Sequence, residues 1–328
     1  MPANLPPHYY AAEQQYREAK TPEEKIEALE EMIAIMPKHK GTDKLKADLR
    51  RRIARHRDES QQKKGASKFK TAYSIQKEGA AQVAIIGFPN TGKSSLVSLI
   101  TNAAPEVADY PHTTHKPMPG MAVYENIQFQ LIDTPPVTKD FTEPLFADLI
   151  RRTDVVMIFL DLEADPLQQL EDTLEFLASF RIFAEGLPVP ENILKKPAIK
   201  TTLLVANKMD STEREEDFNV FCELSPVQLP RLGISAKTGK NIPALLSRLY
   251  DLSKIIRVYT KSPGKEADPT KPFVLPAATT LGELAAKVHK DFAERMKYAK
   301  VWGTAVHDGQ MVQRDYVLQD GDIVEIHI

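Results

Sequence analysis

One short segment carries the residue types and the spacing needed to hold a polyphosphate. Gly-Phe-Pro-Asn-Thr-Gly-Lys-Ser, from Gly87 to Ser94, matches the pattern G-x-x-x-x-G-K-[ST]. The glycines allow the backbone to curl until successive N–H groups point at phosphate oxygens. In such a loop Lys93 would reach the β- and γ-phosphates, and the Ser94 hydroxyl would bind Mg²⁺. A glycine-containing turn that matches by chance is the alternative.

The flanking segments fit a phosphate loop. Residues 82–86 form a short β-branched run typical of a buried strand, and residues 95–100 have helical spacing. A helix that begins directly after the loop adds its positive dipole end to the phosphate site. The sequence therefore predicts a nucleoside triphosphate site. The residues expected to contact the nucleotide here are Gly87, Asn90, Thr91, Gly92, Lys93, Ser94 and Ser95.

A second polar segment favours guanine as the base. Asn207-Lys-Met-Asp210 follows another buried-strand run at 201–206. A carboxylate at Asp210 can accept hydrogen bonds from the ring N–H and the exocyclic amine of guanine. Adenine has no such donor pair and would leave the carboxylate unpaired. Asn207 would tie this loop to the phosphate loop, and the stem of Lys208 would cover the base plane. ATP is the alternative nucleotide.

A third segment, Ser235-Ala-Lys237, follows a short apolar stretch. The backbone N–H of Ala236 is placed to meet the guanine oxygen. These segments occur in the order expected for a guanine site, after the phosphate loop. The residues expected to bind the base are Asn207, Lys208, Asp210, Ser235, Ala236 and Lys237.

Two further segments suggest how Mg²⁺ is held. The alternating run 127–132 leads into Asp133, which would hold the ion through a water as the Walker-B acid. Residues 108–117 are rich in proline and polar side chains, which is typical of a mobile loop. A threonine in this loop could bind Mg²⁺ and sense the γ-phosphate. Thr113 and Thr114 both fit this role, and Thr114 is preferred. The predicted metal ligands are Ser94, Thr114 and Asp133.

Composition limits the class of protein. The chain has 328 residues, of which 42% are hydrophobic and 27% are charged, as in ordinary soluble proteins. Its formal charge is −2 and it has one cysteine, which excludes a disulfide framework. No apolar run reaches the roughly 18 residues that a membrane span needs, and no signal peptide is apparent. We therefore expect a cytoplasmic protein of about two or three domains.

The N-terminal residues predict a basic helical hairpin. Thr21-Pro-Glu-Glu24 is a strong helix start, and a second helix is expected over 42–62. Residues 38–70 contain 13 Lys and Arg against four acidic residues, a net charge of +9. Such a stripe can neutralise phosphates, and its near-absence of aromatic residues favours backbone or shape recognition of RNA. A solvated helix face is the alternative.

The C-terminal residues predict a small α/β module after a linker at 262–269. Strands are expected at 271–275, 298–302 and 323–328, with a helix over 280–288.

With these motifs assembled, the chain resembles the Obg-related GTPases, and most closely their developmentally regulated GTP-binding (DRG) branch. The matching segments are 86–95, 108–114, 207–210 and 298–304. The last of these belongs to a module that resembles TGS domains, which have a ubiquitin-like β-grasp fold. The resemblance implies GTP binding and slow hydrolysis coupled to ribosomes or other RNA assemblies. It also supports Thr114 as the switch residue.

The resemblance further implies the domain organisation. We expect a basic helical hairpin over 1–78 and a P-loop GTPase domain over 79–262, followed by a TGS β-grasp domain over 263–328. The GTPase domain is of the α/β class, with a mostly parallel sheet and helices on both faces. The DRG proteins carry an added domain that is shortened here to about 163–200, where only 165–185 shows helical spacing.

Two departures concern catalysis. The family's Asp-x-x-Gly ends here in Pro136, which has no N–H to give to the γ-phosphate. Val137 stands where Ras-like enzymes keep a water-orienting glutamine. Some relatives use K⁺ held partly by the phosphate-loop asparagine, here Asn90, which could equally be a loop-shaping residue. Lys93, Thr114 and Asn90 are the candidate catalytic residues of a slow, K⁺-stimulated or partner-dependent GTPase. A non-hydrolysing GTP-binding adaptor is the alternative.

Overall fold

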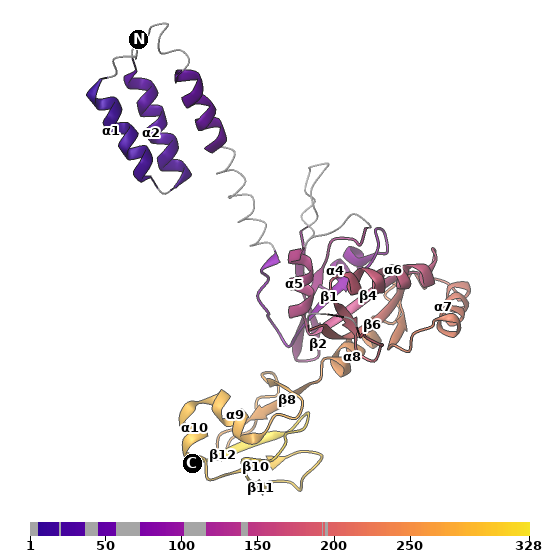
Figure 1. The fold of residues 1–328 in the computed structure, drawn as a ribbon. Helices are drawn as coiled ribbons and strands as arrows, with labels where there is room; N and C mark the ends of the chain where they lie inside the picture. Colours follow the sequence, from indigo (N-terminus) through magenta and orange to yellow (C-terminus); the bar gives the residue numbers. More distant parts are fainter. Residues whose placement is uncertain are drawn as a thin grey trace. The chain divides into compact units, whose positions relative to one another are not determined.

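The computed structural model describes residues 6–19, 21–36, 45–56, 73–101, 116–138, 144–191, 193 and 196–328. The chain divides into two units, Met1–Ser74 and Ile75–Ile328 (Figure 1). None of the helices within the described ranges is long and apolar enough to cross a membrane.

The described residues of the N-terminal unit form three helices rather than the predicted hairpin of two. They are α1 (Pro7–Glu18), α2 (Pro22–Ile35) and a helix over 45–56. Thr21 caps α2 in the predicted capping box with Glu24. Apolar side chains of all three helices share one cluster, which includes Tyr9, Leu29 and Leu49. The remainder of the helix predicted over 42–62 lies outside the described residues.

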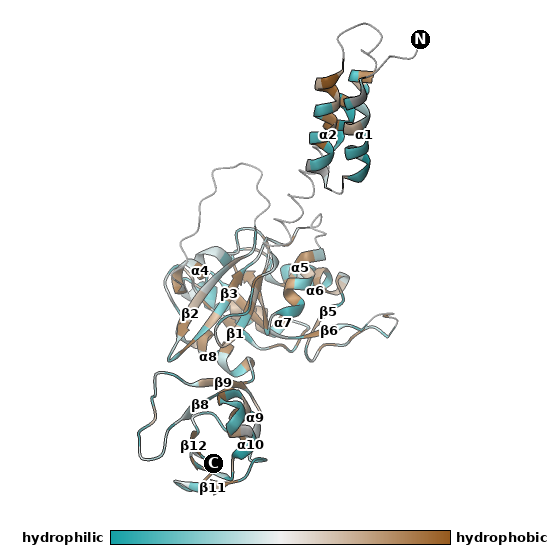
Figure 2. Ribbon diagram, turned by 90° about the vertical axis from the view of Figure 1, so that its left-hand side faces the viewer, coloured by the Kyte–Doolittle hydropathy of each residue, from teal (hydrophilic) through white to brown (hydrophobic). Residues whose placement is uncertain are grey.

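The larger sheet has the order β2-β3-β1-β4-β6-β5, with β7 paired to β6. Only β2 runs antiparallel to its neighbour, so the sheet is mostly parallel, as predicted. Every residue of β1 and β4 is buried, and the apolar strands form the core (brown in Figure 2). The strands are β1 (Ala81–Ile86), β2 (Met118–Tyr124), β3 (Ile127–Asp133), β4 (Val155–Asp161), β5 (Ile182–Ala184), β6 (Ala198–Asn207) and β7 (Arg231–Gly233).

The helices of this domain are α4 (Lys93–Ile100), α5 (Pro144–Arg152), α6 (Pro166–Ser179), α7 (Thr212–Leu224) and α8 (Ile242–Leu252). Helical structure in the insert ends at Ser179 rather than continuing to residue 185. The residues that follow form β5, which pairs with the start of β6. The short insert therefore extends the main sheet.

Parallel strands bring the site residues to one edge of the sheet. Register pairs Ile85 of β1 with Asp133 of β3, and Asp161 of β4 with Asn207 of β6. The carboxyl ends of these strands therefore meet at the edge where ligands bind in open α/β sheets.

The C-terminal sheet has the order β11-β10-β12-β8-β9. Its elements are β8 (Ile255–Thr260), β9 (Phe273–Pro276), α9 (Leu281–Val288), α10 (Lys290–Arg295), β10 (Tyr298–Trp302), β11 (Gln310–Val312) and β12 (Ile323–His327). Strand β8 pairs with both β9 and β12, and its buried Ile256 and Val258 join the core of this sheet.

The pairing of β8 corrects the predicted boundary at residue 262. Residues 255–260 belong to the second sheet, so the predicted linker 262–269 instead connects β8 to β9 within it. The physical reason is that the alternating apolar residues of β8 pack in a core that also contains β12, which lies near the far end of the chain.

Candidate nucleotide-binding site

The phosphate loop connects the end of β1 to the start of α4. Gly92 has φ +92 and Asn90 has φ +62, left-handed values that turn the chain tightly before the helix. The Nζ atom of Lys93 donates to the carbonyl oxygens of Gly87 at 2.9 Å and Phe88 at 2.8 Å. Burial lowers the pKa of Lys93 to about 8, against the opposing effect of the Asp133 carboxylate. The loop thus holds its lysine in place at the entrance of α4.

Ser94 and Asp133 meet at the phosphate end of the site. The Ser94 hydroxyl donates to Oδ2 of Asp133 at 2.5 Å, although the two residues are 39 positions apart. Thr134 fixes the end of β3, since its hydroxyl donates to the carbonyl oxygen of Ile85 at 2.6 Å. Hydroxyl and carboxylate oxygens are the ligands that Mg²⁺ prefers, so this pair fits the ion. Thr114, the third predicted ligand, lies outside the described residues, as does Thr113.

Asn207 connects three segments of the site. Its Nδ2 donates to the carbonyl oxygen of Thr91 at 2.8 Å, which is the contact predicted with the phosphate loop. Its Oδ1 accepts from the backbone N–H of Ala236 at 2.9 Å. This N–H, which we expected to face the guanine oxygen, is therefore given to Asn207. The three loops are held as one unit by a single buried amide.

Asp210 is oriented by the segment that starts at Ser235. The Ser235 hydroxyl donates to Oδ1 of Asp210 at 2.5 Å, and it accepts from the N–H of Thr238 at 2.9 Å. Nζ of Lys237 lies 3.9 Å from Oδ2 of the same carboxylate. Asp210 is thus held at the end of β6, next to the segment predicted to bind the base.

Lys208 has two partners that the sequence analysis missed. Its Nζ donates to Oδ2 of Asp161 at 2.6 Å and to Oε2 of Glu163 at 3.0 Å. The hydrogen bond to Asp161 is the main cause that raises the pKa of Lys208. Asp161 ends the buried strand β4, as Asp133 ends β3, and this parallel was the available signal. The pairs fix the direction of the Lys208 stem.

Glycine is required at two points where backbones approach closely. A Cβ at Gly92 would lie 2.4 Å from Nδ2 of Asn207, and a Cβ at Gly87 would lie 2.3 Å from the carbonyl oxygen of Phe159. Any larger residue would push the phosphate loop away from β4 or from the Asn207 amide.

The segment after Asp133 supplies few donors. Pro136 has no N–H, and the N–H of the buried Val137 donates to the carbonyl oxygen of Gly87 at 3.0 Å. The site thus brings together the predicted phosphate, metal and base residues of the described chain, with Ser95 on the exposed first turn of α4.

Two family models match the chain. Residues 82–189 match a model described as 50S ribosome-binding GTPase, and residues 256–328 match the TGS domain. The TGS match includes nearly all of β8, in agreement with its place in the second sheet.

Curated relatives align over almost the whole chain. An uncharacterised GTP-binding protein of Methanocaldococcus jannaschii is 29% identical, with 93% of each chain covered. Developmentally-regulated GTP-binding protein 1 of Xenopus laevis is 27% identical, over 92% of this chain and 98% of the relative. Among solved structures, a GTP-binding protein from Pyrococcus horikoshii has a TM-score of 0.47 and 17% identity, covering 75% of this chain and 99% of that one.

The family models and the curated relatives agree with the geometry of the site. The α/β sheet with its phosphate loop carries the GTPase match, and the second sheet carries the TGS match. The chain is a homologue of the developmentally-regulated GTP-binding proteins, with a GTPase domain followed by a C-terminal TGS domain.

Proposed function

We propose that this protein is a slow, Mg²⁺-dependent GTPase switch that acts on the ribosome or on a structured RNA. The observation that carries the GTP site is the Asn207 amide, which joins the phosphate loop at Thr91 to the base segment at Ala236. Asp210, held beside it by Ser235, has the chemistry to select guanine. The match to a ribosome-binding GTPase model supports the choice of partner.

Mg²⁺ would be held by Ser94, Thr114 and, through a water, Asp133. The ion supplies neutralisation of the negative charge on the phosphates. Lys93 adds its own positive charge beside the β- and γ-phosphates, and Asn207 and Gly92 keep the loop aligned with the base site. Thr114 would sense the γ-phosphate, so that GTP and GDP give different arrangements of its loop.

Hydrolysis is expected to be slow because the γ-phosphate side has few oriented donors. Pro136 has no N–H, and the N–H of Val137 is engaged by Gly87. Asn90, exposed in the loop at φ +62, is the residue that would hold K⁺ there. We therefore expect phosphate release over hours that is faster in K⁺ than in Na⁺, with the difference lost in Asn90→Ala. Release would be followed with a phosphate sensor, with and without ribosomes.

The alternative is a GTP-binding adaptor that does not hydrolyse its ligand. It is favoured by the same two residues, Pro136 and Val137. Pro136→Gly restores an N–H at the position where the family has one, and Pro135→Gly is the matched control that loosens the chain one residue earlier. If phosphate release is absent with either cation, with ribosomes and in Pro136→Gly, the adaptor is the correct description.

The basic N-terminal unit is proposed as the RNA-binding surface. In the helix over 45–56, Arg50, Arg51 and Arg52 are exposed, while Leu49 and Ile53 are buried in the apolar cluster. The arginines therefore lie on the side of the helix away from its core. The rest of the basic segment 38–70 lies outside the described residues. A TGS contact with RNA and a cytoplasmic location also stay predictions.

We expect the arginines to make ribosomal RNA binding steeply salt-dependent. Each lost phosphate contact should reduce the slope of log K against log [salt] by about 0.7 to 0.9. Replacing Arg50, Arg51 and Arg52 with alanine should therefore flatten the slope by roughly two units or more. Arg17→Ala, which removes an exposed arginine of α1, is the matched control. An unchanged slope in the triple variant would exclude this helix face.

A further inference from the structure

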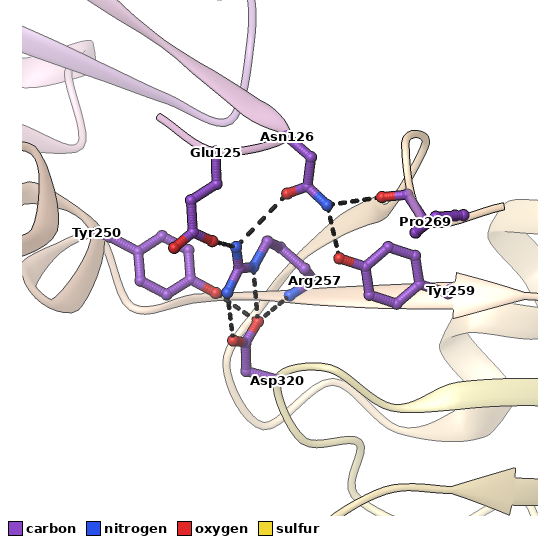
Figure 3. Close-up of polar contacts among 7 residues, drawn as sticks. All are labelled: Glu125, Asn126, Tyr250, Arg257, Tyr259, Pro269 and Asp320. Carbon is purple, nitrogen blue, oxygen red and sulfur yellow. Dashed lines mark hydrogen bonds and ion pairs between the residues drawn. The ribbon is translucent and has the colours of Figure 1, made fainter. Parts of the chain in front are cut away.

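A polar cluster lies where the β2–β3 hairpin meets the TGS sheet (Figure 3). We call this cluster the Arg257 joint. It consists of Glu125, Asn126, Tyr250, Arg257, Tyr259 and Asp320.

Arg257 of β8 is the centre of the joint. Its Nη2 lies 2.9 Å from Oδ2 of Asp320, and its Nε donates to Oδ1 of the same carboxylate at 3.3 Å. Its Nη1 donates to the Glu125 carboxylate at the tip of the hairpin. The side chain of Arg257 is only 16% exposed. Partly buried bidentate contacts of this kind are stronger and more directional than surface ion pairs.

Asn126, at the same hairpin turn, contacts the TGS domain independently. Its Nδ2 donates to the hydroxyl oxygen of Tyr259 at 2.6 Å and to the carbonyl oxygen of Pro269 at 2.9 Å. Adjacent turn residues therefore attach the hairpin to two separate parts of the second domain.

Two elements lead from the nucleotide site to the joint. Strand β3 runs from this hairpin to Asp133 at the phosphate end, a distance of about 20 Å for a strand of this length. Helix α8 begins at Ile242, shortly after the base segment at 235–237, and carries Tyr250 near its C-terminus. The Arg257 guanidinium lies 4.7 Å from the centre of the Tyr250 ring, and the Tyr250 hydroxyl donates to Asp320. Arg257 thus contacts one element from each half of the site.

The packing beside the joint leaves room for the hairpin to move. A cavity of about 420 Å³ separates the hairpin from the start of β9, with Val123, Pro272 and Val274 among its lining residues. The attachment is partly apolar as well, since Ile255 of β8 and Val274 of β9 pack against the core of the larger sheet. Inter-domain surfaces within one chain commonly permit relative motion unless they are large and hydrophobic.

Arg257 also has a partner that does not depend on the hairpin. Asp320 holds Arg257 from within the TGS domain, through both the side chain and the backbone N–H at 2.7 Å. If the hairpin withdrew Glu125, the guanidinium would keep this bidentate partner. The Arg257 guanidinium would therefore stay paired with Asp320, and loss of the Glu125 contact would not leave a buried charge without a partner.

We propose that the Arg257 joint couples the bound nucleotide to the orientation of the TGS sheet. A shift of β3 relative to α8 makes or breaks the contact between Arg257 and Glu125, and the TGS sheet turns with it. Because coupling is reciprocal, a partner that holds the TGS domain in one orientation changes the relative affinity for GTP and GDP. This inference rests on the proposed GTP switch, but it does not require hydrolysis.

The test measures a distance across the joint in the full chain. Spin labels would be placed at Asn219→Cys on α7 and Ala286→Cys on α9, both exposed positions, in a Cys222→Ser background. Pulsed EPR distances would be recorded with GDP and with the non-hydrolysable analogue guanylyl imidodiphosphate, each with Mg²⁺. We expect different mean distances with the two nucleotides.

The variants test the named contacts. Arg257→Ala, Glu125→Gln and Asn126→Ala should each reduce the nucleotide-dependent shift and change the ratio of analogue to GDP affinity by about fivefold or more. The two hairpin variants lie in an exposed or partly exposed turn, so they keep the test valid if Arg257→Ala fails to fold. Lys254→Ala is the matched control, because it removes an ion pair with Glu185 away from the hairpin. It should leave the shift intact.

Two results would overturn the proposal. One is the same distance with both nucleotides in the parent protein, and the other is a full shift in folded joint variants. Titration of the same samples separates this failure from failure of the proposed function. If neither guanine nucleotide binds, both ideas are wrong, whereas binding without a distance change contradicts the joint alone.

Discussion

Gly92→Ala is expected to reduce guanine nucleotide affinity at least about 100-fold, a loss near 3 kcal/mol. An added Cβ would lie 2.4 Å from Nδ2 of Asn207, at a position with φ +92. The left-handed conformation alone costs a non-glycine residue about 1–2 kcal/mol. Asn207 cannot move aside freely, because it is buried and bonded to both Thr91 and Ala236. The substitution therefore disturbs the phosphate and base halves of the site together.

Gly186→Ala is the matched control for backbone strain. Gly186 has φ +91, and a Cβ there would have nothing within 4 Å. This variant should lose a comparable amount of stability to strain but should bind fluorescent GDP as the parent does. Affinities from titration and melting temperatures would be measured for both variants. A Gly92→Ala protein that binds within about threefold of the parent would show that the Asn207 amide does not hold the loops together.

The sequence patterns of short segments predicted the phosphate part of the site. The strand at 81–86, the loop and the following helix are specified by neighbouring residues, and so is the end of β3 at Asp133. Parallel pairing of the strands then places these ends at the same edge of the sheet, as the pairing of Ile85 with Asp133 shows. The contact between Asn207 and Thr91 could be predicted for the same reason.

Hydrogen-bond partners that are distant in the sequence were harder to predict. Lys208 pairs with Asp161, which is 47 positions earlier in the chain, because β4 and β6 are neighbours in register. Similarly, the N–H of Ala236 could be assigned to the base from its position, whereas its actual acceptor is Oδ1 of Asn207. Such choices depend on which strands lie side by side and cannot be derived from spacing along the chain.

The segments at the domain boundaries were predicted least well. Strand β8 follows α8 after only two residues, so nothing in the sequence marks a boundary between the two domains before this strand. Its pairing partners are β9 and β12, of which β12 begins more than 60 residues later. Helix α1 has a weak apolar stripe. It is stabilised by packing against apolar side chains of α2 and of the helix over 45–56. Both elements are stabilised mainly by tertiary contacts.

Asp210→Asn is expected to change the base that the site prefers from guanine to xanthine. The carboxylate would accept two hydrogen bonds from guanine, and charge-assisted bonds of this kind contribute about 1.5–3 kcal/mol each. An asparagine turns one acceptor into a donor, so the guanine amine would face an N–H group. We expect GTP affinity to fall roughly 100- to 1,000-fold as a result.

Xanthine carries a carbonyl group in place of that amine and keeps its ring N–H, so it complements the asparagine side chain. Xanthosine triphosphate should therefore bind the variant better than GTP does, and the parent protein should show the reverse order. The substitution should preserve the local fold, because an amide oxygen can still accept the Ser235 hydroxyl bond that now goes to Oδ1 of Asp210. Competition titrations with GTP, xanthosine triphosphate and ATP would measure the order of affinities, and ATP should remain weak for both proteins. If the variant keeps the parent's preference for GTP, then Asp210 does not contact the base, and the assignment of guanine loses its physical basis.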